Sequence, residues 1–192
     1  MTKLSANIVS SEDELLVLVD AEDNETGHMT KAECHDGAGV LHRAFSVFLF
    51  NQHGEILLQQ RGADKRLWPM YWSNSCCSHP RKGESLEFAT TRRLQDELNV
   101  SATLEFVYKF AYQAGFGEAG SENEMCSVFL GRLDDEPNAN ATEIEAMRFV
   151  PADDLNDELA TTPDKFTPWL KLEWQRLSKE FAAVLAKYSA PD

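Results

Sequence analysis

The nine residues from Trp72 to Pro80 hold the densest group of reactive side chains in the sequence. They include the adjacent thiols of Cys76 and Cys77 and the imidazole of His79. A free thiol has a pKa of about 8.5, so a cysteine can give or take a proton near neutral pH. We therefore single out Cys77 as a candidate nucleophile or acid–base, and expect Cys76 to point the other way if the segment is extended. For an arbitrary cysteine, inert packing in the core is the commoner role.

Five residues with imidazole or carboxylate side chains form a second candidate group: His35, His42, His79, Glu122 and Glu124. His35 and His42 flank the start of an expected strand, and the alternating Glu122 and Glu124 face the same side of an extended segment. Nitrogen and oxygen ligands of this kind suit a divalent transition metal such as Mn²⁺ or Zn²⁺. Most scattered histidines are ordinary surface or core residues, and His53, in an expected turn, is left out of the group.

A third group of charged residues lies in a loop and in the helix that we expect after it. Its members are Glu84, Arg92, Arg93, Asp96 and Glu97. Apolar residues repeat with a period of about 3.6 over residues 85–98, and Ser85 is placed to cap the helix. Carboxylates one turn apart can hold Mg²⁺, which prefers oxygen ligands and often bridges to phosphates. The simpler interpretation is a solvated, charged helix face.

The rest of the chain has strands in hairpins with helices interspersed. We expect strands at residues 14–20, 41–50, 55–61, 104–112, 125–133 and 144–150, with turns at 23–27 and 51–54 and an irregular segment at 31–40. Besides residues 85–98, we expect a helix that starts at Pro151 and a final helix from Thr167 to Tyr188. This order predicts an α/β (or α+β) sandwich, with a mixed sheet flanked by helices.

The composition is that of one soluble domain. At 192 residues we expect a single domain, 1–192, with a flexible N-terminus at 1–13 and a C-terminal helix at 165–188 packed on it. A net charge of −14 argues against nucleic-acid binding, and no apolar run is long enough for a membrane span. The four cysteines form no disulfide pattern, which indicates reduced thiols and a cytoplasmic location.

Several short motifs occur in the order and spacing of one known enzyme family: Lys31 to His35, Leu41 and His42, Trp68 and Pro69, Trp72 to Pro80, Gly83 to Ser85, Glu122 to Cys126, and Thr167 to Trp169. On these motifs the chain resembles type I isopentenyl diphosphate isomerase, a family with the Nudix fold, over nearly all of residues 10–185. The segment from Ser78 to Val100 resembles the Nudix box. It departs from that pattern at Ser78, Arg93, Asp96 and Asn99.

The resemblance implies a role for each group of residues. The implied ligands of Mn²⁺ or Zn²⁺ are His35, His42, His79, Glu122 and Glu124. Glu97 and the backbone of Cys77 would hold a Mg²⁺ that arrives with the diphosphate. The implied substrate-binding residues are Lys31, Arg61, Lys65 and Arg93, which would form the basic patch that an acidic protein needs in order to hold a diphosphate. The implied catalytic residues are Cys77, Glu124, Tyr112 and Trp169.

The implied reaction interconverts isopentenyl diphosphate and dimethylallyl diphosphate. Because no carbonyl acidifies the substrate C–H bonds, the alkene is protonated first, and the tertiary carbocation then loses a proton on the other side. Cys77 and Glu124 would be the two acid–base groups, and Trp169 would face the cation. Water must be kept from the cation, and residues 114–120 and 1–35 are candidates for a lid.

Two other functions fit parts of the same sequence. A Nudix pyrophosphohydrolase acting on a nucleoside diphosphate derivative would use Glu84, Asp96 and Glu97 to bind Mg²⁺ and activate water. A non-catalytic protein would use the histidines and acids to hold a structural Zn²⁺, and would leave Cys77 and Trp169 without a role. For the quaternary structure we expect a monomer, with a dimer as the alternative.

Overall fold

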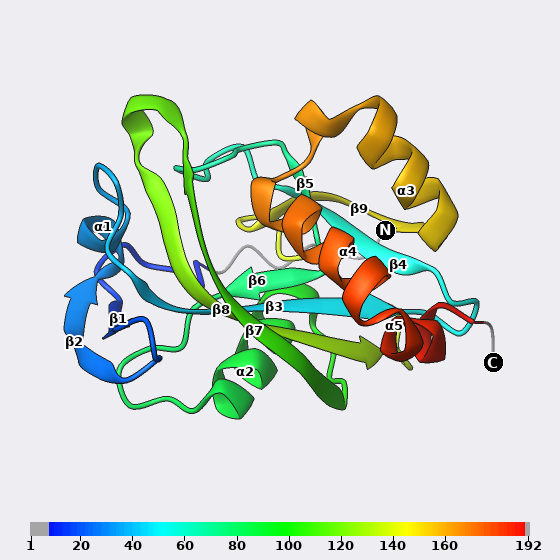
Figure 1. Ribbon diagram of the computed structural model, residues 1–192, viewed down its shortest axis with the longest axis horizontal. Helices are drawn as coiled ribbons and strands as arrows, with labels where there is room; N and C mark the ends of the chain where they lie inside the picture. The colour runs from blue at the N-terminus through cyan, green and yellow to red at the C-terminus, as the bar shows by residue number, and fades with distance from the viewer. Residues whose placement is uncertain (1–7, 191–192) are drawn as a thin grey trace.

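A mixed sheet forms the centre of the computed structural model, which describes residues 8–190 (Figure 1). Its strands are β1 (Leu15–Val19), β2 (Glu25–Thr30), β3 (His42–Phe50), β4 (Ile56–Arg61), β5 (Trp72–Ser73), β6 (Cys76–Ser78), β7 (Leu104–Gly115), β8 (Ser121–Arg132) and β9 (Ile144–Val150). The helices are α1 (Lys31–Cys34), α2 (Leu86–Leu98), α3 (Ala152–Thr161), α4 (Pro168–Glu180) and α5 (Ala182–Ser189). Short 3₁₀ turns span Gly117–Ala119 and Pro163–Lys165.

Strand β3 is a central strand of this sheet. It pairs in parallel with β8 over its full length, from His42 opposite Glu124 to Phe50 opposite Arg132. On its other side it pairs antiparallel with β6, where Ser46 lies opposite Cys77. Parallel and antiparallel pairs therefore coexist, as the predicted mixed sheet requires.

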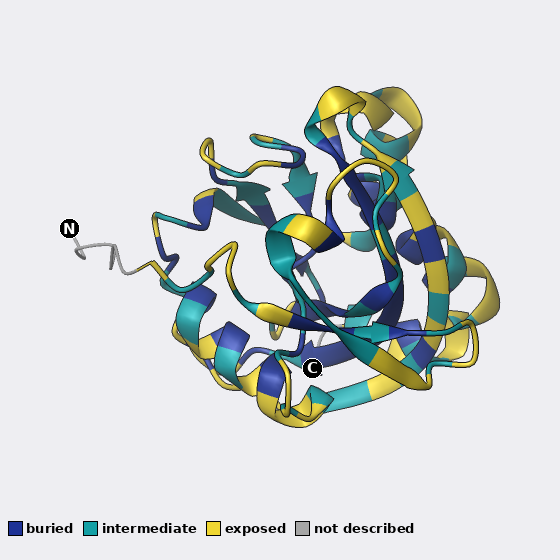
Figure 2. Ribbon diagram, turned by 90° about the vertical axis from the view of Figure 1, so that its left-hand side faces the viewer, coloured by how far each residue is buried: buried dark blue, intermediate teal, exposed yellow. Residues whose placement is uncertain are grey.

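The two faces of β3 are covered by different helices, because successive side chains of a strand point to opposite faces. Phe48 and Phe50 join an apolar cluster with α3, α4 and α5, whereas Val47 and Leu49 pack with α2. In Figure 1, α4 and α5 (orange to red) lie on one side of β3 and α2 (green) on the other. Figure 2 shows the buried residues concentrated on the central strands.

Strands β3 and β4 flank the predicted turn at 51–54, and they pair only next to it, at Phe50 and Ile56. Beyond that point β5 pairs with β4, β6 pairs with β3, and β9 is the main partner of β4. The buried Ser75 hydroxyl joins the divided strands, since it accepts from Leu49 N and donates to Leu57 O, both at 2.7 Å. The segment with the two thiols is thus inserted where β3 and β4 separate.

Two local predictions were wrong. Strand β2 was missed because its sequence is polar, yet it pairs with β1 from Glu25 to Thr30. The segment expected to be irregular from residue 31 begins with α1, which Thr30 and Glu33 cap reciprocally. The Gly-rich segment at 114–120, a candidate for a lid, is the connection at the tip of the β7–β8 hairpin, the tall green hairpin of Figure 1.

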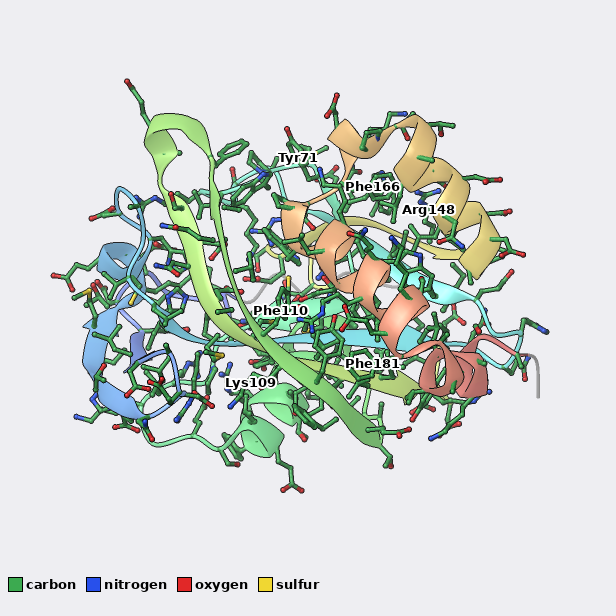
Figure 3. The ribbon with its side chains drawn as sticks, viewed as in Figure 1. Tyr71, Lys109, Phe110, Arg148, Phe166 and Phe181 are labelled. Carbon is green, nitrogen blue, oxygen red and sulfur yellow. The ribbon has the colours of Figure 1, made fainter. Side chains whose placement is uncertain are left out.

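The predicted final helix is also wrong in one respect, because it is broken at Phe181 into α4 and α5. The Tyr108 ring of β7 stacks on the Phe181 ring with their centroids 4.7 Å apart, and Phe110 lies next to Tyr108. Figure 3 labels Phe110 and Phe181 where β7 passes the junction of α4 and α5. Aromatic packing between β7 and the helices therefore determines where the helix breaks. The apolar period within the helix gives no sign of this break.

The other predicted elements are confirmed to within a few residues, including α2 with its Ser85 cap and β9 from Ile144 to Val150. The N-terminal prediction lies partly outside the described residues, which begin at Ile8. Val9 is tied to the body of the protein, because its carbonyl accepts from Arg81 and Arg93. None of the helices within residues 8–190 is long and apolar enough to cross a membrane.

Glu173 of α4 is a fully buried carboxyl in the layer between the helix and the sheet. One of its oxygens accepts from the Cys126 thiol at 3.5 Å, and the other has no hydrogen-bond partner among the described residues. Burial raises the pKa of Glu173 to about 8. The carboxyl is therefore mainly protonated at neutral pH in the folded protein.

We predict that Glu173→Gln makes the stability of the protein less sensitive to pH. Because the folded pKa lies above the unfolded one, ionisation of Glu173 destabilises the fold by about 1.4 kcal/mol for each pH unit between the two values. Wild-type stability should fall from about pH 5 to about pH 8, and the variant should lack this component in urea unfolding. Glu180→Gln, at the exposed end of the same helix, is the control. Parallel pH profiles of wild type and Glu173→Gln would contradict the prediction.

Candidate active site

A cavity of about 780 Å³ opens beside β3, β6 and β8. Most of the residues predicted for the site line it: Lys31, His35, Arg61, Lys65, Cys77, His79, Arg93, Tyr112, Glu122, Glu124 and Trp169. His42 lies just behind the wall, fully buried, and Glu97 also lies outside the lining. Side chains from distant parts of the chain thus meet at one place.

Three histidines and two glutamates form a compact cluster at one end of the cavity. One nitrogen or oxygen from each of His35, His42, His79, Glu122 and Glu124 lies within 4.8 Å of all the others. His35 follows α1, His42 begins β3, His79 follows β6, and the two acids alternate on β8. The parallel register that places His42 opposite Glu124 brings strand ends separated by about eighty residues to this point.

The imidazoles are oriented as metal ligands are. Nδ1 of His35 lies 2.6 Å from Lys31 O, and Nδ1 of His42 lies 2.7 Å from Val40 O, so the backbone holds both rings with Nε2 toward the cluster. The buried Nε2 of His42 has no hydrogen-bond partner among the described residues. A buried polar atom without a partner is costly unless another species binds it. The residues present therefore fit a divalent metal.

The two acids of the cluster differ in their proton affinity. Burial acts to raise the pKa of Glu122, but His35, whose Nε2 lies 2.9 Å from its carboxylate, lowers it to about 2. Burial and the neighbouring charge of Glu122 raise the pKa of Glu124 well above its usual value. Glu124 accepts a hydrogen bond from the Tyr112 hydroxyl at 2.6 Å and lies 2.9 Å from His79 Nε2. A carboxyl that tends to keep a proton is thus paired with a phenol at the cavity wall.

The two adjacent thiols point in opposite directions, as predicted. Cys77 lines the cavity, whereas Cys76 is buried against α2 with its sulfur 3.5 Å from Glu97. Burial raises the pKa of the Cys77 thiol to about 12, so this thiol is protonated at neutral pH. Of the two, Cys77 is the one that can exchange a proton with a bound molecule.

An aromatic wall lies near Cys77. Trp169 is anchored by a 2.9 Å hydrogen bond from its Nε1 to Ser73 Oγ, and the Trp68 ring meets it edge-on with centroids 5.3 Å apart. The guanidinium of Arg61 lies 5.1 Å from the centre of the Trp169 ring. The wall is therefore rigid, and it already has a cation on one side.

Several cations of the cavity lining are paired with carboxylates. Lys31 lies 3.0 Å from Glu12, and Arg93 pairs with Glu97 and with Glu143. Lys65 also pairs with Glu143. Glu143 was missed by the sequence analysis, because a lone glutamate between loop and strand carries no motif.

Charged residues of the Nudix-box segment, in α2 and just before it, form ion pairs with one another. Glu84 holds Arg92 through two hydrogen bonds of 2.8 and 2.9 Å, and Arg93 holds Glu97. Asn99 ends the helix in the left-handed conformation, at φ 55°. Asparagine tolerates this conformation better than most residues, which explains how it replaces the usual glycine.

Comparison with known proteins identifies the family. Residues 40–170 match the NUDIX domain family. Isopentenyl-diphosphate Delta-isomerase 1 of Photorhabdus laumondii is 41% identical over 163 residues, covering 84% of this chain and 93% of its own. The chain belongs to the isopentenyl-diphosphate Delta-isomerase family. Members from Serratia proteamaculans and Nocardia farcinica are each 43% identical to it, over 82% and 80% of its length and 87% and 88% of their own.

Solved structures place the isomerase chain in the Nudix fold. A Deinococcus radiodurans protein superposes with a TM-score of 0.71 at 22% identity, over 85% of this chain and 98% of its own. A MutT protein from Methanosarcina mazei superposes with a TM-score of 0.61 at 15% identity, over 73% of this chain and 95% of its own. The predicted Nudix-like sandwich is confirmed.

We predict that His42→Ala weakens binding of Mn²⁺ or Zn²⁺ by about 100-fold or more, because it removes a buried nitrogen aimed at the cluster. Calorimetric titration of the purified protein with each metal would measure this. The control is His53→Ala, since His53 is exposed in the turn after β3. Equal affinity in the two variants would exclude His42 as a ligand.

Proposed function

We propose that this protein interconverts isopentenyl diphosphate and dimethylallyl diphosphate with Cys77 and Glu124 as its two acid–base groups. One observation carries the proposal: a thiol and a carboxyl hydrogen-bonded to a phenol line the same cavity. Neither group belongs to the ion pairs of the Nudix helix.

The chemistry explains why two proton-exchanging groups are needed. The alkene of isopentenyl diphosphate has no neighbouring carbonyl, so a base alone cannot remove an allylic proton at a useful rate. Protonation of the terminal carbon gives a tertiary carbocation, and loss of a proton from the allylic carbon then completes the 1,3 shift. The acid and the base exchange roles in the reverse direction.

The sheet supplies these groups from two sides. Cys77 lies on β6 and Glu124 on β8, and the two strands flank β3. We assign protonation of the terminal carbon to Glu124, with Tyr112 hydrogen-bonded to it, and removal of the allylic proton to Cys77. For this direction Glu124 must start protonated and Cys77 must start as the thiolate, which burial makes a strong base. Each turnover moves one proton from Glu124 to the substrate and one from the substrate to Cys77, and the proton on Cys77 has to return to solvent or to Glu124 before the next turnover.

Trp169 is the residue that we assign to the carbocation. An indole face attracts a cation by about 2 kcal/mol or more where water is excluded. The ring is 3% exposed and is held by Ser73, so it would need no reorientation as charge develops. Exclusion of water also protects the cation from hydration.

A divalent metal would be held by His35, His42, His79, Glu122 and Glu124. When bound it would supply positive charge that fixes the two glutamates. Glu97 with the backbone of Cys77 is our proposed second position, for the Mg²⁺ that accompanies the diphosphate. Mg²⁺ is commonly bound in this way, by few carboxylates together with substrate phosphates.

Lys31, Arg61, Lys65 and Arg93 are the proposed diphosphate-binding residues. Arg61 differs from the others, because among the described residues its side chain contacts the carbonyls of Leu67 and Trp68 and the Trp169 ring. A cation without a carboxylate partner among the described residues is the one most available to an anion.

For the cellular location we propose the cytoplasm, in keeping with four free cysteines. For the quaternary structure we propose a monomer.

The hydrolase alternative is disfavoured by the same geometry. Glu84, which it requires as a metal ligand, has both carboxylate oxygens bound by Arg92. A hydrolytic metal would have to displace that arginine.

We expect the purified protein with Mg²⁺ and Mn²⁺ to convert isopentenyl diphosphate to dimethylallyl diphosphate in deuterated water, with deuterium entering the methyl groups. Product analysis by NMR would detect both changes. A panel of nucleoside diphosphate derivatives should release no phosphate. Release of phosphate from that panel without any isomerisation would instead support the hydrolase.

We predict that Cys77→Ala lowers kcat by at least about 100-fold, the usual effect of losing an acid–base group. Cys76→Ala is the matched control, because its thiol is one residue away on the other face of the sheet, and it should retain most activity. Circular dichroism would show that both variants fold. An active Cys77→Ala with an inactive Cys76→Ala would mean that the wrong thiol was chosen.

A further inference from the structure

Glu143 is a buried carboxylate at the anion end of the cavity to which the reaction described above gives no role. It lies just before β9, lines the cavity and is 5% exposed. Its Oε2 accepts from Lys65 Nζ and, at 2.9 Å, from Arg93 Nη2. One carboxylate oxygen therefore contacts two of the four proposed diphosphate-binding cations.

The fold holds Glu143 in this position. Its carbonyl accepts from Gly62 N at 2.8 Å, in the loop that carries Lys65, and its own N–H donates to Asn140 O. Asn140 N in turn donates to Glu97 O at the end of α2. The carboxylate is thus fixed between the loop of Lys65 and the helix of Arg93.

The charges of this group balance. Lys65 pairs with Glu143, Glu143 with Arg93 and Arg93 with Glu97, so two cations and two anions form one chain of ion pairs. Nε of Arg93 is bound to Glu97, Nη1 to Val9 O, and Nη2 to both acids. A diphosphate that binds here must share or displace these contacts.

We propose that Glu143 is a positioning residue that acts as a built-in counter-ion: it competes with the diphosphate for Lys65 and Arg93 and so weakens diphosphate binding. This inference rests on the proposed function. In the empty cavity Glu143 offsets the cost of placing the buried Arg93 and the half-buried Lys65 side by side. In the complex its negative charge opposes the diphosphate at short range.

Weaker binding suits an isomerisation of this kind. Substrate and product carry the same diphosphate group, so contacts to it stabilise both equally and do not lower the barrier of the chemical step. Very tight contacts would slow product release. A counter-ion lets the site keep several cations without excessive affinity.

The test is Glu143→Gln, which keeps a hydrogen-bond acceptor and removes the charge. The Kd for inorganic pyrophosphate with Mg²⁺, measured by calorimetry, should fall about tenfold, or about 1.4 kcal/mol. The KM for isopentenyl diphosphate should fall with it while kcat does not rise, a combination that a loss of structure would not produce. Glu145→Gln, an exposed position two residues along that carries the same charge change, should leave both values unaltered.

A second comparison covers the case in which Glu143→Gln fails to fold because it leaves an unbalanced buried cation. Lys65→Gln with Glu143→Gln removes one charge of each sign and leaves Arg93 paired with Glu97. This double variant should bind pyrophosphate more tightly than Lys65→Gln alone. An equal or weaker affinity in both comparisons would overturn the inference.

The outcomes also separate this inference from the function on which it rests. Wild-type protein that neither binds pyrophosphate nor isomerises the substrate would overturn both. Wild-type protein that does both, with affinity unchanged or lower in Glu143→Gln, would overturn only the role of Glu143.

Discussion

The parallel pairing of β3 with β8 is the interaction on which the rest of the site depends. Its register sets His42 beside Glu124, and the same alternation turns Glu122 toward the histidines. A shift of one residue would turn both acids to the other face of the sheet. Nine consecutive residue pairs, buried along most of their length, make such a shift costly. The cluster is therefore as stable as the centre of the sheet.

The separation of β3 and β4 then adds the second half of the chemistry. Ser75 bridges the divided strands, and the short strand after it places Cys77 and His79 on the face that carries Glu124. Side chains of α4 close the cavity with an aromatic ring. On the other face, α2 contributes its arginines to a network of ion pairs. The Nudix helix thus supports the anion end of the cavity, and the acid–base groups lie on strands.

The sequence was informative where residues act locally or in motifs. Helix α2 could be predicted from its period and its Ser85 cap, and motifs whose order matches one family pointed to most of the residues that line the cavity. Long-range packing could not be predicted: the break at Phe181 depends on the ring of Tyr108, and polar β2 is a strand because β1 pairs with it. The role of Glu143 could not be predicted for the same reason, because its partners Arg93 and Lys65 lie about fifty and about eighty residues away in the sequence.

The neighbouring thiols of the three-residue β6 have an evolutionary consequence. Inserting or deleting a single residue between Ser73 and Cys76 would present the sulfur of Cys76 to the cavity and bury that of Cys77 against the Nudix helix. Such a length change would turn His79 to the wrong face as well. The sulfur of Cys76 in the place of Cys77 would therefore not be enough to restore the active site. The spacing of this short segment, more than the number of its cysteines, is what natural selection has to preserve.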